Sequence, residues 1–333
     1  MSMFSLHLQG RPTTYWRPAA GKTAALRAGP DTAAPDGNPN PGTTMTEGSS
    51  SLAALRQQID GIDDAVHDLL MRRAAIAGEI RSSKGGGPVW RPSREAQVLR
   101  RLMERHAGRF PRATVVQIWR EIMSAMVRLQ GEFAVAAYAT ETYRTCRDLA
   151  RDHFGGETPI ALYSSMRAVL TAVQDGSAAV GVLPLPEDSE DAPWWPILAG
   201  MSGERPTVAA RLPFAPTAPG SGDSALCVAR IQPEQSGADR SLYAIRTSPV
   251  VSRARLNDAI AAAGIRPRQL IGRGPSIADT AVFLAELDGY AGPDDSRMKR
   301  LADPDKGIAE ATVFLGVYAT PFEPSALADR GDV

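Results

Sequence analysis

The chain of 333 residues has room for about two domains, each with a hydrophobic core of its own. Its 37 Lys and Arg balance 37 Asp and Glu, which gives no reason to expect nucleic acid or a membrane surface as a partner. Two distant cysteines, Cys146 and Cys227, argue against a disulfide scaffold or a structural zinc. No apolar run is long enough for a membrane span. We therefore expect a cytoplasmic globular protein without metal or cofactor.

Residues 1–48 are rich in Pro, Gly, Thr and Ala and show no apolar period, which predicts a disordered tail. Four basic residues precede the first acidic one, Asp31, so a transit peptide is the alternative. Translation from Met45 is a second alternative. A short disordered tail is also expected at 323–333.

From Leu52 onward, apolar residues recur at steps of three and four, which predicts an amphipathic helix. The pattern continues to the glycines at 85–87, giving about 33 residues and roughly 50 Å. One small domain cannot bury the apolar stripe of so long a helix. We therefore expect a partner helix from a second copy of the chain.

Two shorter helices follow. Pro92 can open the first, and Val98, Leu99, Leu102 and Met103 mark its apolar side. The second begins after Pro111 and carries a longer apolar stripe that ends near Val127. Residues 49–131 are therefore predicted to form an all-α module of three helices.

Several polar residues of this module combine into a candidate site. Arg73 and Lys84 are 11 positions apart on the long helix and so project from one side of it. The full set is Arg56, Arg73 and Lys84 on the first helix, Arg94 and Glu95 on the second, and Gln130 on the third. Guanidinium groups bind carboxylates bidentately and Lys adds a point donor, so the set predicts a site for a small dianion.

The segments LAALRQQIDGIDDAVHDLLMRRAAIAGEIRSSK, RPSREAQVLRRL and IWREIMSAMVRLQ resemble the all-helical class of chorismate mutase. The resemblance implies an intertwined homodimer with shared active sites that rearranges chorismate to prephenate. It implies that Arg56 binds one substrate carboxylate across the subunit boundary and that Arg73 binds the other from within. Lys84 and Gln130 would hydrogen-bond the ether oxygen of the breaking bond.

The resemblance also implies that Glu95 holds the ring hydroxyl, with Arg94 supporting substrate or Glu95. Two positions depart from the family pattern. Arg91 stands where the family often has an acidic residue, and Met126 stands where it often has a small hydroxyl residue. We interpret both as tuning of the site, because the six candidate residues are all present.

The implied reaction agrees with this set of residues. A Claisen [3,3] rearrangement needs no nucleophile and no general base; it needs the substrate held in a compact conformer. Negative charge grows on the ether oxygen as its bond breaks, and a fixed cation such as Lys84 stabilises that charge.

The rest of the chain alternates strands and helices, which predicts an α/β domain at 132–232 and a further region at 233–322. Strands are expected at 133–139, 159–164, 178–185, 225–231, 241–248, 268–274, 280–290 and 311–319, and helices at 141–154, 166–176 and 252–264. Trp194 and Trp195 are expected in a surface loop, and His106 and His153 at the surface.

This half resembles prephenate dehydratase with its ACT-type regulatory module, through GSAAVGVLPLPEDS (176–189), SGADRSLYAIR and TAVFLAELDGY. The family's catalytic Thr-Arg-Phe falls on Ser224, Ala225 and Leu226, and its effector segment falls on residues 272–275. Ala225 can neither protonate nor position a leaving group. We therefore expect a dehydratase-like fold, with an ACT-like α+β end, that has no dehydratase activity.

Three functions remain open. The main hypothesis is a chorismate mutase of aromatic amino acid biosynthesis with a non-catalytic α/β half. The second is a bifunctional mutase and dehydratase, and the third is an inactive protein that senses aromatic amino acids. An aromatic amino acid is also an expected effector in the first case.

Overall fold

The computed structural model describes residues 51–83, 89–188, 193–216, 223–273, 280–303, 305 and 308–328. The chain divides into two units, Met1–Ile59 and Asp60–Val333. In the first, the described residues are the start of helix α1. The three predicted helices are confirmed as α1 (Leu52–Ser83), α2 (Pro92–Arg105) and α3 (Arg112–Gln130). Pro92 stands in the first turn of α2, where its missing N–H costs no helical hydrogen bond.

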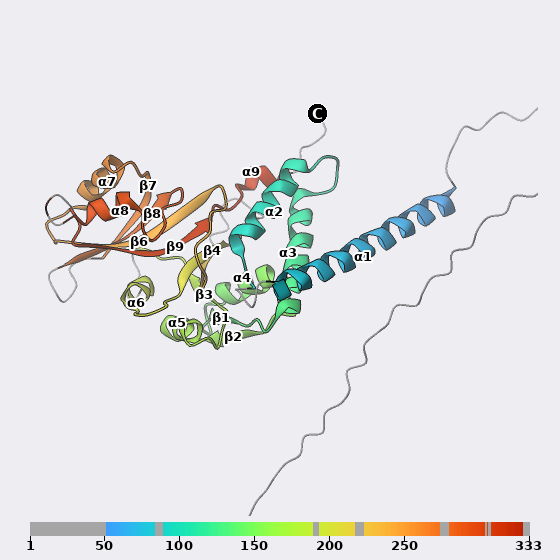
Figure 1. The fold of residues 1–333 in the computed structure, drawn as a ribbon, viewed down its shortest axis with the longest axis horizontal. Helices are drawn as coiled ribbons and strands as arrows, with labels where there is room; N and C mark the ends of the chain where they lie inside the picture. Colours follow the sequence, from blue (N-terminus) through green and yellow to red (C-terminus); the bar gives the residue numbers. More distant parts are fainter. Residues whose placement is uncertain are drawn as a thin grey trace, which may run out of the picture. The chain divides into compact units, whose positions relative to one another are not determined.

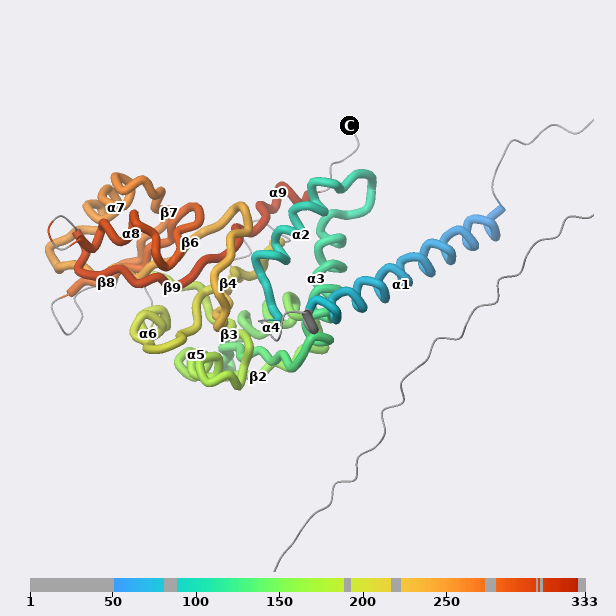
Figure 2. Tube along the Cα trace, in the orientation of Figure 1, coloured from blue at the N-terminus to red at the C-terminus, as the bar shows by residue number. Residues whose placement is uncertain are grey.

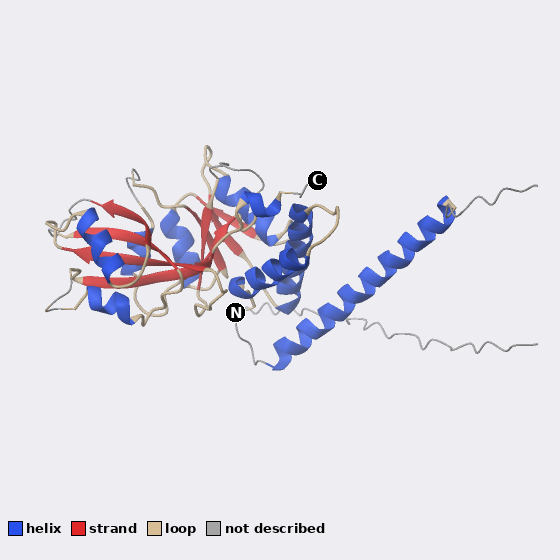
Figure 3. Cartoon of the chain, turned by 90° about the horizontal axis from the view of Figure 1, so that it is seen from above, coloured by secondary structure: helices blue, strands red, loops and turns tan. Residues whose placement is uncertain are grey.

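The described residues after α3 build one mixed sheet with helices on its faces (Figures 1, 2 and 3). The strands are β1 (Val135–Tyr138), β2 (Ile160–Tyr163), β3 (Val180–Pro184), β4 (Thr207–Leu212), β5 (Ala225–Ala229), β6 (Asp239–Thr247), β7 (Pro267–Arg273), β8 (Ala281–Asp288) and β9 (Ala311–Ala319). The helices are α4 (Thr145–Phe154), α5 (Met166–Gln174), α6 (Trp195–Gly200), α7 (Arg253–Ala262), α8 (Ser296–Leu301) and α9 (Pro324–Leu327).

The sheet order is β2-β1-β3-β5-β4-β9-β6-β8-β7, so the strands expected on either side of residue 232 pair in one continuous sheet. Strands β1, β2 and β3 are parallel to one another, as βα units require. From β6 to β9 the elements run β-α-β-β-α-β, with β6 antiparallel to both β8 and β9. Helices α7 and α8 bury their apolar residues against one face of these strands. The α+β arrangement expected for this end of the chain is thereby confirmed.

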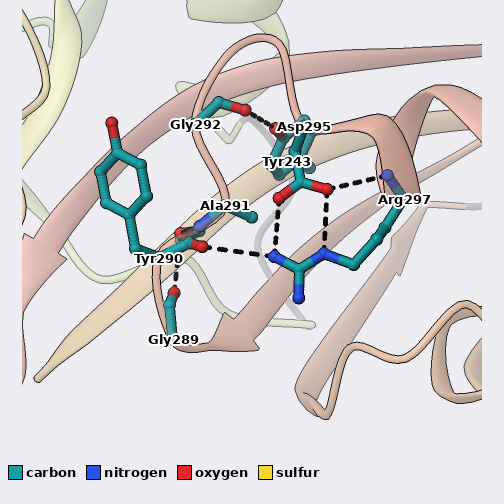
Figure 4. Close-up of polar contacts among 8 residues, drawn as sticks. Tyr243, Gly289, Tyr290, Ala291, Gly292, Asp295 and Arg297 are labelled. Carbon is teal, nitrogen blue, oxygen red and sulfur yellow. Dashed lines mark hydrogen bonds and ion pairs between the residues drawn. The ribbon is translucent and has the colours of Figure 1, made fainter.

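The connection after β8 is held by polar contacts, which Figure 4 shows. The Tyr243 hydroxyl on β6 donates to the Gly292 carbonyl. The Arg297 guanidinium donates to the Asp295 carboxylate at 2.6 Å and to the Tyr290 carbonyl at 3.3 Å. Asp295 also caps α8 by accepting from the Arg297 backbone N–H. These bonds fix the start of α8 beside the sheet.

The expectation that Trp194 and Trp195 lie in a surface loop was wrong. Their side chains are completely buried, and the Trp194 indole N–H donates to the Pro184 carbonyl at 2.9 Å. The flanking prolines indicated a loop, but Pro196 instead stands in the first turn of α6. Neither α6 nor β4 was predicted, because both are short and lie between Pro- and Gly-rich segments. The expectation of a disordered tail from residue 323 was wrong for its first residues, because Pro324–Leu327 form α9 and Leu327 is buried.

The helices α2 and α3 share a core with the sheet. Ala96, Leu99 and Met103 of α2 pack with Val116 and Met123 of α3, and this cluster continues into Phe214, Ala319 and Leu327. The end of α3 also packs through Val127 against Trp90, Phe133 and Phe154. The α/β half therefore supports the two helices that bear candidate site residues.

Strand β9 approaches β4 so closely at Gly316 that a side chain cannot be accommodated there. Its φ is +150°, and an added Cβ would meet the backbone O, N and C atoms of Val208. We predict that Gly316→Ala lowers the free energy of unfolding by at least about 2 kcal/mol, measured by urea denaturation. Gly203→Ala is the control, because its φ is +77° in open space; backbone strain alone should cost about 1 kcal/mol. Equal losses in the two variants would contradict the close approach.

Candidate active site

Helices α1, α2 and α3 line a cavity of about 540 Å³. Arg73 enters it from α1, Arg94 and Glu95 from α2, and Gln130 from α3. Three further charged residues, Arg91, Arg101 and Glu234, also line it. The remaining walls are apolar: Ala77, Ile80, Val89, Val98, Trp119, Met123, Met126 and Val127. Four of the six residues singled out in the sequence therefore meet in one cavity.

The other two candidate residues are not placed in this cavity. Lys84 lies outside the described residues. Arg56 is exposed on α1, in the unit that ends at Ile59. Their expected roles therefore remain predictions.

Glu95 is held in place by an arginine that is not among the residues predicted from the sequence. Arg120 on α3 donates to Glu95 Oε2 at 2.7 Å, and the two side chains are only 10% and 13% exposed. Burial raises the pKa of Glu95, and the nearby guanidinium of Arg120 opposes that rise. A signal was present, because Arg120 interrupts the apolar face formed by Val116, Met123 and Val127. A charge on such a face needs a buried partner.

The α/β half covers the other side of this ion pair. The Phe214 ring, between β4 and β5, lies 5.3 Å from the Arg120 guanidinium carbon, a cation–π contact. His153, at the end of α4, is buried, and its ring packs edge-on to Trp90 with centroids 6.5 Å apart. The expectation of a surface His153 was wrong, because α4 packs its last turn against α3. The other surface expectation, His106, is partly buried.

Segment 234–238, between β5 and β6, also reaches the cavity, through Glu234. Arg91 Nη2 donates to Glu234 Oε1 at 2.8 Å. Arg94 Nη1 donates to Gln97 Oε1 at 3.3 Å, within α2. Glu234 could not be predicted from the sequence, because it lies far along the chain from the helices it faces.

The residues placed at the dehydratase motif lie elsewhere. Ala225 and Leu226 are buried in β5, paired with β3 and β4. Ser224 lines a second cavity, of about 640 Å³, together with Arg211 and Arg240. In the effector segment, the Gly272 N–H donates to Asp188 at 3.1 Å, and residues 274 and 275 lie outside the described residues.

The geometry of the helical cavity suits a small dianion. Arg73 and Arg94 supply guanidinium groups for carboxylates, while Glu95 supplies an acceptor and Gln130 an amide. The apolar walls can enclose a ring.

None of the helices within the described ranges is long and apolar enough to cross a membrane.

His153 should make stability depend on pH. Burial, and secondarily the Arg120 charge, holds its pKa well below the ordinary value of 6.5. The unfolded chain therefore binds the proton first, and stability is lost as pH falls below that value, by up to about 1.4 kcal/mol per pH unit. We expect His153→Phe to flatten the decline between about pH 7 and pH 5 in urea denaturation.

The raised pKa of Glu95 works in the opposite direction and is common to both proteins, so comparing them isolates the histidine. His153→Gln serves as a second neutral replacement. Parallel profiles for the native protein and both variants would contradict a neutral, buried His153.

Comparison with known proteins agrees with the geometry. Residues 55–131 match the chorismate mutase type II family. A bifunctional chorismate mutase/prephenate dehydratase of Pseudomonas aeruginosa is 32% identical over 148 residues, covering 42% of this chain and 40% of the relative. One from Aquifex aeolicus is 33% identical over 141 residues, covering 40% of this chain and 38% of the relative. The chain thus spans about two fifths of the length of these relatives.

Among solved structures, the prephenate dehydratase of Arthrobacter aurescens, determined in complex with L-Phe, is similar at 17% identity with a TM-score of 0.41. The match covers 58% of this chain and 91% of that one. Residues 55–131 of the chain thus match chorismate mutase type II, and the described residues that follow form a mixed α/β sheet region.

Proposed function

We propose that the protein rearranges chorismate to prephenate, in the cytoplasm and as part of aromatic amino acid biosynthesis. The observation that carries the proposal is the meeting of Arg73, Arg94, Glu95 and Gln130 in one cavity. These residues come from three helices, within the segment that matches the chorismate mutase type II family. Chorismate has two carboxylates and a hydroxyl-bearing ring, and the cavity offers partners for each.

Catalysis then rests on conformation and electrostatics. Arg73 binds one carboxylate, and Glu95 accepts from the ring hydroxyl while Arg120 keeps its carboxyl in place. Gln130 donates to the ether oxygen, and we assign Lys84 the same task. Donors fixed around the ether oxygen stabilise the negative charge that grows there as the C–O bond breaks. The new C–C bond forms within the same substrate, so no group passes to the protein.

We further propose that the site is completed by a second copy of the chain. Apolar residues along α1 are exposed, among them Ile62, Val66, Leu69 and Ile76, each between 47% and 64%. Such a stripe on a long helix is expected to be covered by another helix. Because the chain is then a homodimer, Arg56 of one protomer supplies the second carboxylate partner in the site of the other.

A second candidate is a bifunctional mutase and dehydratase. The relatives from Pseudomonas aeruginosa and Aquifex aeolicus bear that name, and their alignments are longer than the family match. Against it, buried Ala225 and Leu226 occupy the positions at which the sequence places the dehydratase motif. A sensor of aromatic amino acids, or an effector role for one of them, is a third candidate function for the α/β half.

Incubation of the purified protein with chorismate, followed by chromatography without acid, separates these functions. The proposal predicts prephenate as the product, and phenylpyruvate in addition would establish the bifunctional alternative.

Lys84→Ala should lower kcat by at least about 100-fold without changing the melting temperature, since it removes charge stabilisation from the transition state. Unchanged chorismate with the folded native protein would overturn the mutase proposal and leave the sensor.

A further inference from the structure

One face of α2 is bonded along segment 234–238. Arg91 Nη2 donates to Glu234 Oε1 at 2.8 Å, and Ser93 Oγ donates to the Glu234 carbonyl at 2.8 Å. Gln97 Nε2 donates to the Gln235 carbonyl at 3.1 Å, and Arg100 Nη1 to the Ser236 carbonyl at 3.0 Å. Ser93, Gln97 and Arg100 follow the three- and four-residue spacing of a single helix face. The α/β half therefore fixes how α2 is rotated about its axis and where it lies along that axis.

The adjacent face of the same helix lines the cavity. Arg94, Glu95 and Val98 all border it. Because segment 234–238 fixes α2 from the neighbouring side, it also fixes where Arg94 and Glu95 stand. Within this segment, Glu234 alone lines the cavity itself.

Arg91 is the cavity arginine that Glu234 controls. Arg91 lines the cavity, and its guanidinium donates to the Glu234 carboxylate. The two side chains are 44% and 42% exposed, so their ion pair contributes little to folding stability. Its effect lies in the electrostatics of the cavity. A free Arg91 would offer a dianion another carboxylate partner beside the other arginines of the cavity, Arg73, Arg94 and Arg101, and so another orientation.

We infer that Glu234 is a positioning and specificity-determining residue of the cavity. Its carboxylate pairs with Arg91, so that Arg91 does not bind the substrate and a dicarboxylate binds in one orientation. Arg91 in turn neutralises the Glu234 carboxylate, which would otherwise repel the substrate. This inference rests on the proposed mutase function. It makes the α/β half a contributor of a wall residue to the helical site.

Removal of each partner alone should then affect a different kinetic constant. Glu234→Gln frees Arg91, so kcat should fall by about five- to tenfold while KM stays the same or falls, because binding persists in unproductive orientations. Arg91→Gln leaves Glu234 unpaired before a dianion, so KM should rise by about tenfold with kcat largely kept. The double variant should return kcat and KM to within about twofold of the native values.

The ion pair Arg246–Glu310 supplies the matched control. Its side chains are 54% and 43% exposed and 3.3 Å apart, and neither residue lines the helical cavity. Arg246→Gln, Glu310→Gln and their combination should leave kcat and KM unchanged. Melting temperatures of all variants, measured on the full chain, separate loss of folding from loss of positioning.

The native rate decides first whether the mutase proposal stands. If the native protein converts chorismate and the double variant recovers, the inference holds. If the native protein converts chorismate but the Arg91 and Glu234 effects simply add, or match the control pair, the inference is overturned while the mutase function stands. If the native protein does not convert chorismate, the proposed function and the inference both fail.

Discussion

The buried ion pair between Arg120 and Glu95 is the interaction on which the helical site depends. Removing two charges from water costs several kcal/mol, and only a close, well-oriented contact compensates that cost. The 2.7 Å hydrogen bond and the Phe214 ring over the guanidinium supply such a contact. Loss of one partner would leave an uncompensated charge, at a cost of about 3–5 kcal/mol. The pair therefore locks α2 and α3 in one register and orients the carboxyl group that faces the cavity.

The second constraint on the site is the packing of the α/β half against α2 and α3. Phe214 and Ala319 belong to the same apolar cluster as Leu99 and Met123, so the core continues from the helices into the sheet. On another side, segment 234–238 bonds α2 through its backbone carbonyls. The helical site thus rests on residues that lie far beyond it along the chain. This arrangement gives the α/β half a physical role whether or not it has chemistry of its own.

The elements that the sequence predicted well are those with long, regular patterns. The spacing of apolar residues predicted α1 to α3, and the alternation of strands and helices predicted most of the sheet. Arg73, Arg94, Glu95 and Gln130 were predicted from residue type and spacing on those helices. Helix α6 was not, because Pro193 and Pro196 around two tryptophans are equally typical of a loop.

The residues that the sequence missed act through tertiary contacts. The position of Arg120 on an apolar helix face indicates a buried partner, but only the structure identifies that partner as Glu95, 2.7 Å away. Glu234 belongs to a segment with no periodicity, and its relation to Arg91 depends on how the sheet packs against α2. The burial of His153 could not be predicted, because local sequence carries no signal for the packing of α4 on α3.

We propose that one chain does not hold a whole site and that a second copy supplies Arg56. The most direct measurement co-expresses Arg56→Ala and Arg73→Ala chains with different affinity tags and isolates the dimer that contains both. Each variant alone should be inactive, whereas the mixed dimer holds one site with both arginines and should show about half the native rate. A mixed dimer as inactive as either parent, or a native protein that remains a monomer at assay concentration, would contradict the account.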